Sequence, residues 1–153
     1  MSDPRPDPRS VVLDTVLPSF TAVAEREQLQ AFARITGLDD PVYREVDAAR
    51  RAGFPDLLVP PTFLFSLELR RPEPYAVLDA LGVPQSSTLH GEQSFEYHLP
   101  AFAGQALDLA PRLTDYYEKK GGALRFVVRT TTVHAAGDLV ANLTNVLVIR
   151  DGS

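Results

Sequence analysis

The fold of this chain is limited most by a short apolar helix that precedes long segments with a β pattern. Apolar side chains lie almost all round a helix over residues 63–70, at Phe63, Leu64, Phe65, Leu67 and Leu69. Such a helix must be buried on most of its sides. From Ser87 onward apolar and polar residues alternate, which is the pattern of half-buried strands. An antiparallel sheet with one apolar face can bury the helix, so the sequence predicts an α+β fold.

Glycine and proline residues mark the ends of the other expected elements. The helices are expected at residues 25–36, 45–52, 63–70 and 74–81, and the strands at residues 15–23, 94–98, 105–117, 123–134 and 139–150. Gly37 and Gly82 can end helices in the left-handed conformation, and Thr62 is a suitable N-cap. Pro111 indicates a bulge or an edge in its strand. Both faces of the last strand are apolar, so one face is available to a second subunit.

Composition excludes several classes of protein. The formal net charge of −5 argues against a nucleic-acid or anionic-membrane partner. The chain has no cysteine, which excludes disulfides, thiolate nucleophiles and cysteine metal sites. The most apolar region, residues 57–69, is too short to span a bilayer. Residues 1–10 have three prolines and no apolar run, so we expect a disordered tail, one domain over residues 11–153 and a cytoplasmic location.

Several stretches of the chain together carry a family likeness. They are residues 32–43 (FARITGLDDPVY), 52–54 (AGF), 59–63 (VPPTF), 89–100 (LHGEQSFEYHLP), 103–104 (AG) and 117–124 (YEKKGGAL). This set resembles the MaoC-like enoyl thioester hydratases and dehydratases, and in particular their N-terminal, fatty-acid-synthase-type branch. Gln105 departs from that branch, which usually has an acidic residue after the turn glycine. The resemblance implies a single hot-dog domain, in which an antiparallel sheet wraps around the central apolar helix.

The resemblance also implies a catalytic site, and two substitutions remove its catalytic pair. In that family an aspartate and a histidine after the helix-ending glycine hold the water that adds to the double bond. Leu38 stands in the aspartate's place and Tyr43 in the histidine's. Leucine cannot transfer a proton, and tyrosine titrates near ~10, which makes it a poor base at neutral pH. The simplest interpretation is that both side chains pack against the loop.

The same likeness implies a substrate-binding region at the start of the apolar helix. Its residues are Pro61, Thr62, Phe63 and Phe65. In this fold the backbone N–H groups near Thr62 face the thioester carbonyl, and an unpaired donor at a helix N-terminus polarises such an oxygen. An ordinary cap at Thr62 and a plain core role for the two phenylalanines explain the pattern equally well.

Other residues are weak candidates for acid–base chemistry. His90 and Glu92 form the best alternative pair, because residues that are two positions apart on a strand point to the same face. Asp40 is a displaced acid or, with Asp39, shapes the turn at Pro41. His90 and His98 would lie about 27 Å apart along a straight strand of about 3.4 Å per residue, too far to share a metal. We therefore expect neither a metal nor a cofactor.

The leading hypothesis is an accessory subunit of a heteromeric (R)-specific enoyl-CoA hydratase or 3-hydroxyacyl thioester dehydratase, a lyase. A MaoC-like partner would supply the aspartate and histidine, and this chain would form part of the pocket for an acyl-CoA or acyl-carrier-protein thioester. One alternative is a self-sufficient homodimeric hydratase that uses His90 with Glu92, or Asp40. Another is a non-enzymatic homodimer that binds acyl-CoA. A hot-dog thioesterase ranks last, because the acidic motif of its best-known branch is missing.

Overall fold

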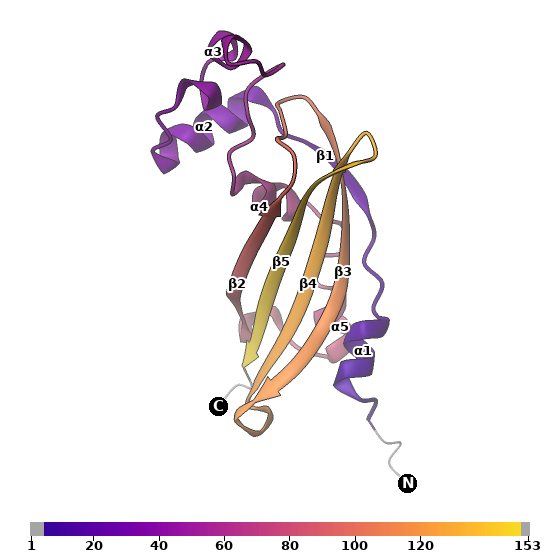
Figure 1. Ribbon diagram of the computed structural model, residues 1–153. Helices are drawn as coiled ribbons and strands as arrows, with labels where there is room; N and C mark the ends of the chain where they lie inside the picture. The colour runs from indigo at the N-terminus through magenta and orange to yellow at the C-terminus, as the bar shows by residue number, and fades with distance from the viewer. Residues whose placement is uncertain (1–4, 151–153) are drawn as a thin grey trace.

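A single five-stranded antiparallel sheet organises the protein, in a computed structural model that describes residues 5–150 (Figure 1). The strands are β1 (Phe20–Val23), β2 (Thr88–Tyr97), β3 (Ala106–Lys119), β4 (Leu124–Ala135) and β5 (Asp138–Arg150). Their order across the sheet is β1-β3-β4-β5-β2. The sheet therefore has β1 at one edge and β2 at the other. The β3–β4 hairpin turns at residues 120–122, where Gly121 and Gly122 have the positive φ angles that the sequence predicts there.

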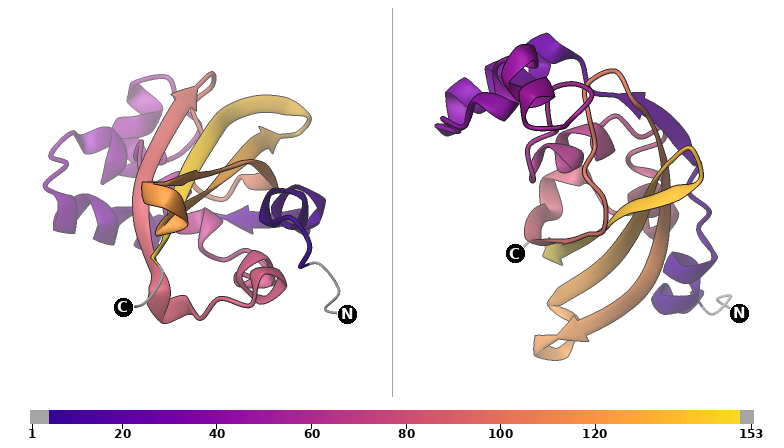
Figure 2. Two further views of the ribbon diagram at one scale, coloured as in Figure 1. Left: turned by 90° about the horizontal axis from the view of Figure 1, so that it is seen from below. Right: turned by 45° about the horizontal axis from the view of Figure 1, so that its top comes forward.

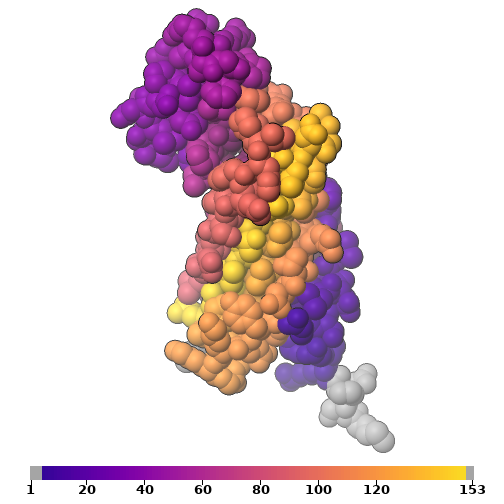
Figure 3. Space-filling view, viewed as in Figure 1, coloured from indigo at the N-terminus to yellow at the C-terminus, as the bar shows by residue number. Residues whose placement is uncertain are grey.

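Short helices cover one side of this sheet and one of its ends. They are α1 (Pro8–Asp14), α2 (Arg26–Thr36), α3 (Val46–Arg51), α4 (Phe63–Glu68) and α5 (Ala76–Leu81). The sheet is curved and α4 lies against its concave side (Figure 2). Helices α2 and α3 stand as a lobe beyond one end of the strands (Figure 3). Within residues 5–150, no helix is both long and apolar enough to cross a bilayer.

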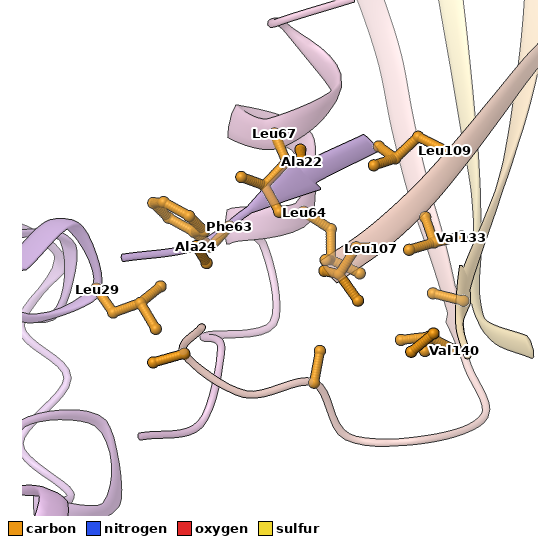
Figure 4. Close-up of a cluster of buried hydrophobic side chains, with 14 of the residues drawn as sticks. Ala22, Ala24, Leu29, Phe63, Leu64, Leu67, Leu107, Leu109, Val133 and Val140 are labelled. Carbon is orange, nitrogen blue, oxygen red and sulfur yellow. The ribbon is translucent and has the colours of Figure 1, made fainter. Parts of the chain in front are cut away.

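The main core forms where α4 meets the sheet (Figure 4). Leu64 and Leu67 of α4 are buried against Leu107 and Leu109 of β3 and Val133 of β4. This packing confirms the α+β arrangement in which a sheet encloses an apolar helix. It follows from the pattern that the sequence shows, because a helix that is apolar on most sides is stable only where other elements cover those sides.

The ends of the helices agree with the sequence in some places and not in others. Gly37 and Gly82 close α2 and α5 in the left-handed conformation, with φ of 73° and 64°. Thr62 stands at the N-cap position of α4 as predicted, but its side chain makes no capping hydrogen bond. The backbone of Thr62 is already helical (φ −88°, ψ −4°), whereas a capping side chain usually needs an extended residue.

The N-terminal segment differs from the expected tail over residues 8–10. Helix α1 begins at Pro8, and the side chain of Asp7 accepts a hydrogen bond from the backbone N–H of Ser10. Arg9 ties the helix to β3 by donating to the carboxylate of Asp115 at 2.7 Å and to the carbonyl of Tyr116 at 2.6 Å. The disordered tail that we expected therefore cannot extend to Ser10. Of the rest of that expectation, residues 5–7 form neither helix nor strand, and residues 1–4 lie outside the described residues.

The two edges of the sheet have different lengths and surroundings. β1 pairs with β3 only from Val23 opposite Ala106 to Phe20 opposite Leu109. Pro111 lies just beyond this pairing, which confirms the edge interpretation, while the bulge in β3 falls later, between Leu113 and Asp115. At the opposite edge, β2 contributes ten residues and pairs with β5 alone among the described strands.

Candidate functional site

The loop after α2 is held by its own polar residues. The carboxylate of Asp40 accepts a hydrogen bond from the backbone N–H of Val42 at 3.1 Å, which caps a single turn at Pro41–Tyr43. Asp39 is exposed and pairs with Arg44 at 3.0 Å. The structure thus favours capping over catalysis for these two acids. Each has a local role that explains its position next to Pro41.

Tyr43, at the end of that turn, forms part of the wall of a cavity of about 300 Å³. The other lining residues come from the segment before α4, from α4 itself, from the end of β2 with the loop after it, and from β5: Leu58, Val59, Pro60, Pro61, Leu64, Tyr97, His98, Leu99, Pro100, Ala101 and Val140. Backbone hydrogen bonds from Leu58 to Val42 (3.1 Å) and from Val59 to Ala101 (2.8 Å) hold these segments together. The position that the likeness assigns to the catalytic histidine therefore does face a cavity.

His98 also lines this cavity, although the sequence did not mark it as a site residue. Its Nε2 lies 3.6 Å from Oε1 of Glu96 and 3.4 Å from Nδ2 of Asn142. Of the residues that line the cavity, His98 is the one with an imidazole, the commonest general base in enzymes. It follows β2 directly and is 55 positions from Tyr43 in the chain, so no local pattern connects the two residues.

The side chain of Tyr97, in the wall of this cavity, has a raised pKa. Burial raises the pKa of Tyr97 from its ordinary 10.0 to about 12. Burial and the hydrogen bond to Glu118 raise the pKa of Tyr116 to about 12 as well. Since both shifts are upward, they favour the folded state fully below pH 10, and this contribution is lost as the pH rises from about 10 to about 12.

A titration of tyrosinate absorbance in the near ultraviolet is expected to show a component near pH 12. Tyr97→Phe and Tyr116→Phe should each reduce that component, and the double variant should remove it. If Tyr97→Phe leaves the absorbance change near pH 12 as large as in the unmodified protein, burial does not raise the pKa of Tyr97.

His90 and Glu92 do not form the pair that the strand pattern predicts. A bulge falls between them, so that His90 lies opposite Leu147 and Glu92 opposite Val146. Neighbouring residues of β5 point to opposite faces, and so do His90 and Glu92. The prediction of a shared face is therefore wrong.

Gly91, the residue between His90 and Glu92, lies at the bulge. A Cβ atom at Gly91 would lie 2.6 Å from Cγ2 of Val148 and 3.0 Å from the carbonyl oxygen of Val146. Those distances are too short for a side chain, so only glycine allows this approach. A periodicity of two cannot reveal a bulge of this kind, because the extra residue looks like any other strand position.

The four residues of the expected substrate-binding region lie in four different environments in the structure. Pro61 lines the cavity beside Tyr43, whereas Thr62 is exposed. Phe63 lies in the core, where its ring meets that of Phe32 edge-on at 5.2 Å. Phe65 stacks on the ring of His90 at 5.1 Å and lines a second cavity. Whether these residues bind substrate stays a prediction, and only Pro61 shares the cavity with Tyr43.

Comparison with known proteins gives matches over most of the chain. A family model described as the FAS1-like dehydratase domain region matches residues 15–143. A UPF0336 protein of Parafrankia sp. is 36% identical over 130 residues, 82% of each chain. A UPF0336 protein of Saccharopolyspora erythraea is 30% identical over 125 residues, which cover 82% of this chain and 80% of that protein.

Solved structures show the same architecture. The C-terminally truncated HadBC complex of Mycobacterium tuberculosis, a 3R-hydroxyacyl-ACP dehydratase, has a chain that is 25% identical, with a TM-score of 0.70 over 90% of this chain and 98% of that one. A MaoC-like dehydratase from Phytophthora capsici is 21% identical, with a TM-score of 0.71 over 94% of this chain and 49% of that one. These likenesses confirm the hot-dog fold that the sequence predicts.

Proposed function

Because the chain belongs to the family of the FAS1-like dehydratase domain region, we propose that it is an accessory subunit of a heteromeric hydro-lyase. The enzyme would be an (R)-specific enoyl-CoA hydratase or a 3-hydroxyacyl thioester dehydratase. A MaoC-like partner supplies the aspartate and the histidine, and this chain contributes part of the pocket for an acyl-CoA or acyl-carrier-protein thioester.

The observation that carries this proposal is the composition of the cavity at Tyr43. Adding water to an enoyl thioester requires a group that takes a proton from water and a group that protonates the α-carbon. Leu38 cannot do either, and the phenol of Tyr43 at the histidine's position does not replace an imidazole as a general base. No carboxylate is among the residues that line this cavity, and Asp39 and Asp40 are engaged elsewhere. His98 is the one lining side chain that could take a proton, and it occupies neither position of the family's pair. The aspartate and histidine of that pair would have to come from another chain.

Two further observations support a partner of the same family. The HadBC protein, whose chain covers nearly the same length, is described as a complex. In the present chain, β2 lies at an edge of the sheet, and its ten residues have a free side along the backbone within residues 5–150. Such an edge can pair with a strand of a neighbouring subunit, which would bring a second loop close to His98 and Tyr97 at the end of β2.

Reconstitution tests the proposal. One sample is the chain purified alone. The other is the chain isolated under mild conditions together with any protein that remains bound. Both samples are assayed with crotonyl-CoA as the substrate. We expect no hydration above the background rate with the chain alone, and formation of the (R)-3-hydroxy product when a partner with an intact Asp/His pair is present. Replacement of the partner's histidine by alanine should abolish this activity. Robust hydration by the chain alone, lost on substitution within residues 37–43, would contradict the proposal.

The position of His98 favours a second candidate function. The protein would be a self-sufficient hydratase homodimer whose general base is His98 and not His90. His98 lies in the cavity with Tyr43 and near the carboxylate of Glu96, whereas His90 lines the other cavity. If a homogeneous preparation hydrates crotonyl-CoA, His98→Ala should lower kcat at least a hundredfold, as expected for loss of a general base. The matched control His90→Ala should leave kcat nearly unchanged. Equal rates for His98→Ala and the unmodified chain would eliminate this candidate.

A further inference from the structure

A second cavity of about 280 Å³ lies between α4, α5 and the concave side of the sheet. Its apolar wall includes Phe65, Leu69, Tyr75 and Leu147. Two arginines, Arg71 and Arg129, lie in its polar wall with Asn145 and His90. It shares no lining residue with the cavity at Tyr43. A mostly apolar pocket with a few convergent polar groups is the usual form of a site for a small organic ligand.

The charges around this cavity do not balance. No aspartate or glutamate is among its lining residues. The nearby carboxylate of Glu68 is fully buried, and its Oε1 accepts hydrogen bonds from Nε of Arg129 at 2.8 Å and from Thr131 at 2.5 Å. Oε1 of this single negative group is therefore paired with Arg129, while its buried Oε2 has no hydrogen-bond partner among the described residues. The two guanidinium groups together carry one positive charge more than Glu68 can neutralise.

Arg71 is the guanidinium group without a carboxylate partner among the described residues. Within residues 5–150 it forms no ion pair, and its hydrogen bonds go to the carbonyl oxygens of Glu68 at 3.5 Å and Pro74 at 3.3 Å. Both distances are longer than the usual 2.9–3.0 Å for an N–H donor and an oxygen. Burial, and then the positive charge of Arg129, lower the pKa of Arg71, and the charges of Glu68 and Tyr75 oppose this only in part. A bound anion would relieve both effects, because it would replace lost hydration and screen the two like charges.

We propose that this cavity binds a small amphipathic carboxylate, with its carboxylate on the guanidinium of Arg71 and its apolar body between Phe65 and Leu147. A planar guanidinium donates two parallel hydrogen bonds to a carboxylate. The apolar wall suits a hydrocarbon chain or ring and disfavours a strongly hydrated inorganic anion. The site does not depend on the proposed hydratase role, because none of its lining residues belongs to the cavity at Tyr43.

The three histidines of the chain can report by NMR which cavity a ligand occupies. His90 lines this cavity, His98 lines the other, and His134 lines neither. The full chain, with any partner that stays bound, is labelled with isotopes in its histidine rings. It is then titrated with octanoate by NMR at constant pH and ionic strength. We expect saturable shifts of the His90 ring resonances, while those of His98 and His134 stay in place. Titrations with 1-octanol and with inorganic phosphate should leave His90 unchanged, because each lacks one half of the proposed ligand.

Arg71 variants complete the test. Arg71→Met should weaken octanoate binding about tenfold or more, as expected for loss of a hydrogen bond to a charged group. Arg71→Lys should retain part of the affinity. The matched control Arg112→Met removes an exposed arginine from β3 and should bind like the unmodified chain. Absence of saturable shifts at His90 with millimolar octanoate, shifts at His98 instead, or full affinity in a folded Arg71→Met variant would each overturn the proposal.

Discussion

Replacing Glu68 with leucine is expected to lower the free energy of unfolding by about 3–5 kcal/mol. Glu68 is fully buried in α4, and one oxygen of its carboxylate accepts hydrogen bonds from both Arg129 and Thr131 of β4. The substitution would leave the guanidinium of Arg129, which is only 8% exposed, without a counter-charge. An uncompensated buried charge is one of the few causes of losses this large. Urea denaturation followed by circular dichroism measures the effect.

The double variant Glu68→Leu/Arg129→Met separates the unpaired charge from the loss of packing. It removes both charges and should recover most of the stability, since a buried ion pair contributes little beyond what apolar side chains of similar volume provide. A double variant as unstable as the single one would show that shape, and not charge, determines the cost. A single variant within about 1 kcal/mol of the unmodified protein would mean that water reaches Arg129 in solution.

Leu67→Ala is expected to cost about 2–5 kcal/mol. Leu67 has no exposed surface and lies in the main core between α4 and the sheet, so the shorter side chain leaves a cavity that rigid strands cannot fill. Leu69→Ala is the matched control, because it makes the same chemical change two residues later, where the side chain is 57% exposed. That variant should change stability by only about 0.5 kcal/mol. Thermal and urea unfolding of both proteins provide the comparison, and similar losses would contradict the assignment of α4 to the core.

Features that depend on neighbouring residues could be predicted from the sequence. The apolar character of α4, the helix ends at Gly37 and Gly82, and the turn at residues 120–122 all depend on local pattern or backbone preference. The hot-dog fold was expected from the family likeness, since an alternation of apolar residues defines strands but not their order in the sheet. In this sheet β2 pairs with β5 and not with β3, which follows it in the chain.

Features that depend on distant contacts could not be predicted. His98 joins the cavity of Tyr43 only because the loop after β2 folds back against the segment before α4. Glu68 stands in the sequence as a polar interruption of an apolar helix, and its partner Arg129 lies 61 positions further on. The shared face expected for His90 and Glu92 fails because a bulge lies between them, at a glycine where Val148 on another strand leaves no room for a side chain. Each case requires knowledge of which strands are neighbours.

The unequal edges of the sheet limit how large an assembly can become. Along β3 beyond Leu109, α1 occupies the flank, and Pro111 has no N–H to offer an incoming strand. The edge at β2 is long and open within the described residues. Two sheets of this topology that join through β2 would leave only the four-residue edge of β1 at each end. Very short edge strands are poor templates for pairing, so growth by strand pairing would stop at a closed pair. The same asymmetry that leaves a place for one neighbour would therefore keep the protein from polymerising into fibres.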